Sequence, residues 1–311
     1  MSETSSRTAV IAALIGNLLI AVTKGFAAAI SGSSAMLSEA VHSVVDSGNE
    51  VLLLYGQYRA AKPPDRTHPL GYGREIYFWS FVVALLIFAL GAGVSIYEGV
   101  IHLQHPVPME DPLINFAVYG FAALFEGVSW WFGWKAFQRN RRGKSFMAAV
   151  RASKDPASFM VLFEDSAALV GIAIAAIATV LSLHFQAPWI DGMGSVLIGL
   201  VLAAVAVILA RESKALLIGD RAADELSDSL LEATLRQPGV RGVENILTSQ
   251  LSPDQVIATL SVHFDDSLDV PKLEKLIGRI ESELRSDHPE LFRVFVRPTP
   301  SQDDPGQAAS A

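Results

Sequence analysis

Four ionisable side chains recur in the stretch from Ser33 to Tyr58, which is otherwise largely apolar. They are Glu39, His42, Asp46 and Glu50. Steps of three and four residues place these side chains on one narrow face of an α-helix. The stretch is long enough to cross a bilayer, which takes ~20 residues. Charged groups at that depth are costly and usually mark ion or proton pathways, so the sequence predicts a membrane helix with one ion-binding face.

His42 and Asp46 have the spacing best suited to chemistry, because side chains one helical turn apart can bind a single ion together. A neutral imidazole and a carboxylate suit zinc and its divalent neighbours. The alternative is that a polar residue in a membrane helix only forms a hydrogen bond to a neighbouring helix. Glu39 and Glu50 lie nearer the helix ends, where solvation or an ion pair is an equal alternative to a role in an ion pathway.

A second apolar segment also carries carboxylates at membrane depth. Asp165 lies about nine residues from the start of this segment, and a rise of ~1.5 Å per residue brings it to a depth similar to that of His42 and Asp46. We therefore expect these three side chains to form one metal site. Glu164 points roughly 100° away from Asp165 and is a less certain ligand. The alternative for both carboxylates is a cap or a pair at a buried turn.

Six apolar segments are long enough to be membrane spans. A chain of 311 residues that is 51% hydrophobic agrees with a membrane protein that also has a soluble domain. The start of the sequence lacks a charged leader and a small-residue cleavage site, so we expect the first segment to be a retained span. The segments are Thr8–Ile30, Ser34–Tyr58, Ile76–Leu103, Leu113–Phe137, Pro156–His184 and Pro188–Ala210.

The loops between these segments indicate an orientation. Lys and Arg occur in every second loop and after the last segment, whereas the alternate loops contain none. The positive-inside rule then places both termini in the cytoplasm. Six spans with short loops lead us to expect the inner membrane of a bacterium. The basic residues are Arg59, Lys62, Arg66, Arg74, Arg139, Arg141, Arg142, Lys144, Arg151, Lys154, Arg211, Lys214 and Arg221.

The chain after Arg211 is polar and predicts a small α+β domain. Its elements are expected in the order α-β-β-α-β, which is ferredoxin-like, and they are Asp224–Gln237, Gly242–Gln250, Val256–Phe264, Val270–Arg285 and Phe292–Arg297. We expect a transmembrane domain over residues 1–210, a cytoplasmic domain over 211–298 and a disordered tail over 299–311. The fold class is therefore an α-helical membrane protein with six transmembrane helices and a small cytoplasmic α+β domain.

The composition excludes several classes of protein. Nearly all of the net charge of −8 belongs to the part after residue 210, and an acidic domain argues against a nucleic-acid partner. The chain has no cysteine, which excludes disulfides, thiolate metal sites and thiol catalysis. No sequence feature suggests a bound cofactor, and the expected partners are the lipid bilayer and metal ions.

The sequence resembles the cation diffusion facilitators, a family of proton-coupled exporters of zinc and related divalent metals. The resemblance covers nearly the whole chain. It rests on GNLLIAVTKG, SEAVHSVVDSGNEVLLLYG, HPLGYGRE, DSAALVG and the acidic tail that ends in FRVFVRP. The sequence is most similar to the branch that has HPLGYGRE and an ED pair in the fifth span, which includes the ninth human zinc-transporter relative.

The resemblance implies a tetrahedral metal site with two ligands from the second span and two from the fifth. His42, Asp46 and Asp165 match three of these positions, whereas the fourth is Val161. Water, Glu164 or another span would then complete the site. Asn17 of the first span and Glu126 of the fourth are speculative ligands. For Glu126 the alternative is an ion pair with Lys24 or a hydrogen bond to a neighbouring helix.

The resemblance also implies a weak second metal site in the loop after the second span. Asp65 and His68 occupy two of its ligand positions, and Tyr72 stands where some relatives have a third ligand. A contact within the loop is an equal alternative for His68. The family's cytoplasmic domain dimerises, so we expect a homodimer. The isolated His263 and His288 of that domain are expected to be ordinary solvated or core histidines.

The function these residues imply is export of a divalent cation, zinc or else manganese, iron, cobalt or cadmium, by alternating access with protons as the counter-ion. Free histidine titrates near pH ~6.5, which suits an exchange of metal for protons. One alternative is a metal sensor or assembly partner that has the same fold but does not transport. A membrane metalloenzyme is a further alternative, but no separate general base or substrate pocket is recognisable, and we expect no enzymatic activity.

Overall fold

The structure is a computed structural model that describes residues 3–109, 111–140, 145–146, 149–150 and 153–300. The chain divides into two compact units, Met1–Lys214 and Ala215–Ala311. The division falls four residues after the boundary expected from the hydropathy, and the expected domain limits themselves stay a prediction. Most of the tail expected to be disordered lies outside the described residues.

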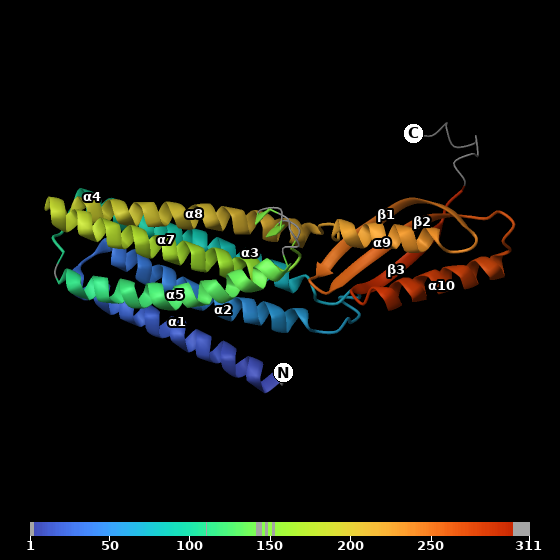
Figure 1. Cartoon of the computed structure of the whole chain (residues 1–311), viewed down its shortest axis with the longest axis horizontal. Coiled ribbons are helices and arrows are strands. Elements are labelled where there is room, and N and C mark those ends of the chain that lie inside the picture. The colour runs from blue at the N-terminus through green and yellow to red at the C-terminus, as the bar shows by residue number, and fades with distance from the viewer. Residues whose placement is uncertain (1–2, 110, 141–144, 147–148, 151–152, 301–311) are drawn as a thin grey trace, which may run out of the picture. The chain divides into compact units, whose positions relative to one another are not determined.

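The first unit consists of long helices that run side by side (Figure 1). They are α1 (Glu3–Ser31), α2 (Ser34–Ala60), α3 (Glu75–Leu86), η1 (Ile87–Ala92), α4 (Gly93–Gln104), α5 (Pro112–Asn140), α7 (Pro156–Phe185) and α8 (Trp189–Ile218). The segments α3, η1 and α4 follow one another without a break and form a single span with a π-helical turn in its middle. The described part of the unit thus contains the six expected spans.

Apolar length identifies four of these spans directly. Glu75–Gln104, Pro112–Lys135, Phe159–Phe185 and Trp189–Ile218 are long and apolar enough to cross a membrane. The described apolar part of α1 is shorter, Asn17–Ser31. Helix α2 has the length of a span, but it carries the ionisable residues that lower its mean hydropathy. It packs against α1, α3, α4 and α7, so its polar face is enclosed by other helices and hidden from lipid.

A carboxylate from another helix holds the first turn of α2. Asp191, in the first turn of α8, accepts hydrogen bonds from the Ser33 hydroxyl (2.8 Å) and from the backbone amides of Ser34 (2.6 Å) and Ala35 (3.2 Å). The Ser33 hydroxyl in turn accepts from the Met36 amide. These bonds satisfy amides that the start of a helix leaves without intrahelical partners. The helix that carries the candidate site is thereby fixed at one end.

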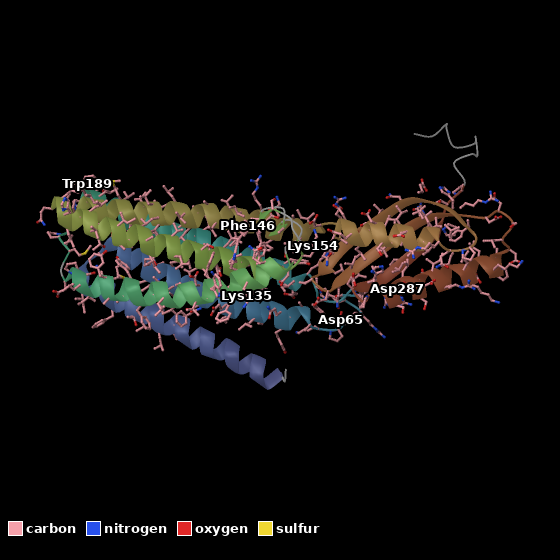
Figure 2. All side chains as sticks on the ribbon, in the orientation of Figure 1. Asp65, Lys135, Phe146, Lys154, Trp189 and Asp287 are labelled. Atoms are coloured by element: carbon pink, nitrogen blue, oxygen red, sulfur yellow. The ribbon has the colours of Figure 1, made fainter. Side chains whose placement is uncertain are left out.

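The two ends of this unit differ in charge. Figure 2 shows Trp189 at one end of the helices and Lys154 at the other, near the loop that contains Asp65. The loop after α2 and the segment before α7 are the basic ones in the sequence. Basic loops at one end agree with the alternation on which the expected orientation rests.

The second unit contains α9 (Asp224–Leu235), β1 (Val240–Ser252), β2 (Gln255–Phe264), α10 (Val270–Asp287) and β3 (Leu291–Pro298). The strands form one sheet in the order β1-β2-β3, with β1 and β2 antiparallel and β2 and β3 parallel. Parallel strands need a crossover, which α10 supplies. The expected α-β-β-α-β order is confirmed, and the strands extend one or two residues beyond their expected limits.

The core of this unit is built from alternate strand residues and one face of each helix. Strand β2 is buried at every second position, and α10 contributes Leu276, Ile280 and Leu284. Asp269 caps α10 by accepting from the Lys272 amide. The unit therefore has its own hydrophobic core, as a separate domain requires.

Candidate metal centre

A small polar cavity of about 30 Å³ lies among α1, α2, α5 and α7. Its volume is sufficient for one ion or one water molecule. Five of its lining residues are carboxylates, and none of its described lining residues is Lys or Arg. The lining residues are Asn17, Ser43, Asp46, Glu50, Glu126, Ser129, Val161, Glu164 and Asp165.

Hydrogen bonds between helices orient three of these carboxylates, which are Glu50, Asp165 and, as described below, Glu164. Asn17 donates to Glu50 (2.6 Å) and connects α1 to α2. Ser129 donates to Asp165 (2.9 Å), which connects α5 to α7. Each donor is neutral, so the carboxylates receive hydrogen bonds without a compensating positive charge. Five carboxylates, with no Lys or Arg among the described lining residues, make this cavity a candidate cation site.

Glu164 is oriented in the same way from α2. The Asn49 amide donates to Glu164 Oε1 over 2.9 Å, and both residues are buried. The 100° offset from Asp165 predicted that Glu164 would point away from a shared ion. The structure instead brings both carboxyls to the same cavity, because the lining extends around this face of α7 and Asn49 holds Glu164 toward α2.

His42 lies behind Asp46 and does not line the cavity. Its Nδ1 is 3.4 Å from Asp46 Oδ1, and the residue is only 1% exposed. Within the described residues, neither ring nitrogen has a hydrogen-bond partner, and Asp46 Oδ1 has none either. Buried polar atoms are nearly always paired in folded proteins, so these three atoms are available to a partner.

The side chains surround the cavity without converging on one point. In the part of the chain that the structure describes, no group of three or more His, Asp and Glu side chains has the arrangement of a metal-ligand shell. A metal ion at this place would have to draw Asp46 and Asp165 toward itself. Rotation of the side chains, or closure of α2 against α7, would produce that change.

The ionisable residues of α2 lie in two different environments. Asp46 and Glu50 line the cavity, whereas Glu39 pairs with Lys24 of α1 over 3.0 Å. The eleven residues from Glu39 to Glu50 span ~16 Å of helix, so the two ends of this ionisable face contact different neighbouring residues. The alternative of an ion pair between Lys24 and Glu126 is wrong, because Lys24 contacts Glu39 instead and Glu126 lines the cavity.

Three further polar residues of this region were not among the expected site residues: Ser43, Asn49 and Ser129. Ser43 lies three residues before Asp46, and Ser129 lies three residues after Glu126. The helical spacing that identified the carboxylates could therefore have indicated these hydroxyls. Asn49 lies three residues after Asp46 and has the same spacing, but its partner Glu164 depends on which helix faces it.

The loop after α2 uses its carboxylate to hold its own backbone. Asp65 accepts from the amides of His68 (2.7 Å) and Thr67 (2.8 Å) and from the Tyr72 hydroxyl (2.7 Å). The imidazole of His68 lies against the Tyr72 ring, with its Nδ1 3.8 Å from the carboxylate. Both oxygens of Asp65 are thus engaged. A metal at the expected second site would compete with these bonds, and that site stays a prediction.

The hydrogen bonds from the His68 amide, the Tyr72 hydroxyl and the Thr67 amide lower the pKa of Asp65 from its ordinary value of 3.8. We expect the loop to keep its order at neutral pH and to lose it only as the pH falls below 3.8, where the carboxylate becomes protonated. Asp65→Ala should raise hydrogen exchange at the Thr67 and His68 amides about tenfold. The Ser267 amide, which donates to Asp265 in a similar turn, is an internal control. Unchanged exchange at Thr67 and His68 would contradict this account.

The two histidines of the second unit have protein partners. His288 Nε2 lies 3.1 Å from the Ser229 hydroxyl, and His263 Nδ1 lies 3.2 Å from the carbonyl of Thr299. Both contacts agree with an ordinary structural role.

Comparison with known proteins identifies the family. The model of the cation efflux transmembrane domain matches residues 10–218, and the model of the cation efflux protein cytoplasmic domain matches residues 222–301. The chain belongs to the cation efflux family, and the resemblance to the cation diffusion facilitators is confirmed. It is an integral membrane protein, and its family and relatives are transporters rather than enzymes.

Three relatives illustrate the range of the similarity. The human protein named proton-coupled zinc antiporter SLC30A9, mitochondrial, is 33% identical over 76% of this chain and 42% of its own length. Metal tolerance protein C4 of Arabidopsis thaliana is 30% identical over 90% of this chain and 62% of its own length. Magnetosome protein MamM of Magnetospirillum gryphiswaldense is 24% identical over 76% of this chain and 70% of its own length. This chain thus spans less than half the length of the human relative.

Solved structures of the MamM CTD match 25% of this chain. In one of these structures the match covers 95% of the solved chain, with 18% sequence identity and a TM-score of 0.24.

Proposed function

We propose that the protein transports divalent metal cations across a membrane and that the cavity among α1, α2, α5 and α7 is its transport centre. The observation that carries this proposal is the set of five carboxylates around a space for one ion, with no Lys or Arg among the described lining residues. Carboxylates crowded in a medium of low dielectric repel one another, and a divalent cation relieves that repulsion. The five carboxylates around so small a space make the centre unsuitable for a neutral substrate.

Asp46 and Asp165 are the ligands that α2 and α7 would contribute, with His42 approaching from behind Asp46. Val161 lines the cavity at the place where the resemblance implies a further ligand. Glu164 lies in the same lining and is the replacement we propose. Asn17 and Glu126 would act on the ion at longer range or through water. This shell is rich in oxygen, which admits manganese, iron or cobalt beside zinc.

Zinc as substrate and protons as counter-ion are supported by the name of the human relative, a proton-coupled zinc antiporter. We propose alternating access, in which metal enters from the cytoplasmic side, binds the centre and is displaced by protons after the centre opens outward. Acidic groups that bind metal when deprotonated give such an exchange its pH dependence.

The oligomeric state of the protein, the side of its termini and the membrane in which it lies are also proposals. The family model that matches the cytoplasmic domain is called ZT_dimer, and this match supports a homodimer. The basic loops support cytoplasmic termini, and the short loops support a bacterial inner membrane. The human relative is named mitochondrial, so localisation of the tagged protein would decide the membrane.

Metal uptake into proteoliposomes with an imposed pH gradient tests this function. Zinc, manganese, iron, cobalt and cadmium are compared side by side. Saturable uptake that needs the gradient is the expected result, and the metal with the highest uptake identifies the substrate. Metal binding without uptake of any of the five would favour a sensor or assembly partner instead.

A further inference from the structure

Lys24 is a buried cation close to the cavity. It is fully buried in α1, and its ammonium group lies 3.0 Å from Glu39 Oε2. Glu39 is also fully buried. Withdrawing an ammonium and a carboxylate from water is costly, and the pairing repays that cost only when the geometry is good and further hydrogen bonds are made. The position of this pair within the membrane helices therefore requires a reason beyond simple packing.

Ser43 connects this ion pair to the cavity. The Lys24 ammonium donates a second hydrogen bond, of 2.9 Å, to the Ser43 hydroxyl. Ser43 is itself a lining residue, and it lies one position after His42 and three before Asp46. A charged donor in α1 thus holds the turn of α2 that carries both proposed ligands.

Glu39 also reaches the helix that carries the other ligands. A methyl group at Gly171 of α7 would overlap Glu39 Oε1, so α7 can pass this carboxylate only because residue 171 has no side chain. Glu39 Oε1 has no hydrogen-bond partner. The Lys24–Glu39 pair thus lies where α1, α2 and α7 meet, and α2 and α7 carry Asp46 and Asp165.

We infer that Lys24 is a positioning residue of the metal centre, which acts through Ser43 to hold the His42–Asp46 turn of α2 at the cavity, while Glu39 serves as its buried counter-charge. This inference rests on the proposed function. Lys24 does not touch the metal in this arrangement. It sets the place of the ligands, so its loss should weaken metal binding more than it weakens the fold.

Zn²⁺ binding to the purified full chain tests this role, with thermal stability measured on the same samples. Ser43→Ala removes the acceptor and keeps the ion pair, and we expect it to raise the Kd for Zn²⁺ about tenfold with little change in Tm. Ser43→Thr keeps a hydroxyl and should restore most of the affinity. Ser47→Ala is the matched control, because Ser47 is a buried serine one turn further along α2 that bonds only to the Ser43 carbonyl.

A single change at Lys24 would leave Glu39 as an uncompensated buried charge and prevent a clear interpretation. The double variant Lys24→Met/Glu39→Gln removes both charges together and is expected to fold. It should raise the Kd about as much as Ser43→Ala does. Combining it with Ser43→Ala should weaken binding no further, because both changes break the same link.

Three outcomes would overturn the inference. Affinities within twofold of wild type in Ser43→Ala and in the double variant would show that the link is merely structural. Effects that multiply when the variants are combined would show that Lys24 and Ser43 act separately. If the wild-type protein bound none of Zn²⁺, Mn²⁺, Fe²⁺, Co²⁺ and Cd²⁺, the proposed function would fail together with the inference, whereas normal wild-type binding with unaffected variants defeats the inference alone.

Discussion

Asp46→Ala is expected to abolish metal uptake, with a loss of at least about 100-fold under a pH gradient, as removal of a central transport ligand should produce. Asp46 is a carboxylate of α2 that lines the cavity, and its Oδ1 lies 3.4 Å from Nδ1 of His42. Its removal takes away a charge that would neutralise the ion and separates His42 from the centre.

The fold should tolerate this change. Among the described residues Asp46 Oδ1 has no hydrogen-bond partner, and Asp46 lies among other carboxylates, so its removal relieves repulsion and costs only the contact with His42. Glu98→Ala is the matched control, because Glu98 is a carboxylate of α4 that is not among the lining residues. We expect both variants to elute as wild type does in size-exclusion chromatography. Uptake in Asp46→Ala comparable to wild type would contradict the assignment of the centre.

Asp191→Ala should cause the largest loss of stability, about 3–5 kcal/mol if the hydrogen bonds to this charged group contribute as such bonds usually do. The Asp191 carboxylate accepts three hydrogen bonds at the start of α2 and lies in the first turn of α8. It therefore interacts favourably with the positive ends of two helix dipoles. Its loss leaves the amides of Ser34 and Ala35 buried without a partner.

A graded series measures this contribution. Asp191→Asn keeps one carbonyl oxygen as acceptor and should fall between wild type and Asp191→Ala in thermal unfolding of the detergent-solubilised protein. Asp220→Ala, in the second unit, controls for removal of an aspartate elsewhere in the chain. Equal Tm values for wild type and Asp191→Ala would show that α2 does not depend on this cap.

The sequence predicted the helices and much of the cavity for physical reasons. Apolar length indicated the six spans, because a bilayer fixes how long a spanning helix must be. Helical spacing placed Asp46 on a polar face of α2, and depth from the membrane surface matched it to Asp165 of α7. The two residues do line one cavity. Their binding of metal remains a prediction.

The sequence could not predict the contacts that depend on how neighbouring helices are rotated. Spacing along one helix does not indicate which face of the next helix it meets. Lys24 was therefore considered with Glu126 although its partner is Glu39, and the 100° offset gave no reason to place Glu164 beside Asp165 in the cavity that both line. The role of Asp191 carried no signal in the sequence, because its three donors lie more than 150 positions earlier in the chain.

The most direct test of the transport centre is an anomalous-difference map from crystals of the full chain grown with Zn²⁺. The account predicts a peak in the cavity between α2 and α7, within ligand distance of Asp46 and Asp165, that is absent from crystals of Asp46→Ala. Peaks confined to the Asp65–His68 loop or to the second unit, with none in the cavity, would contradict it.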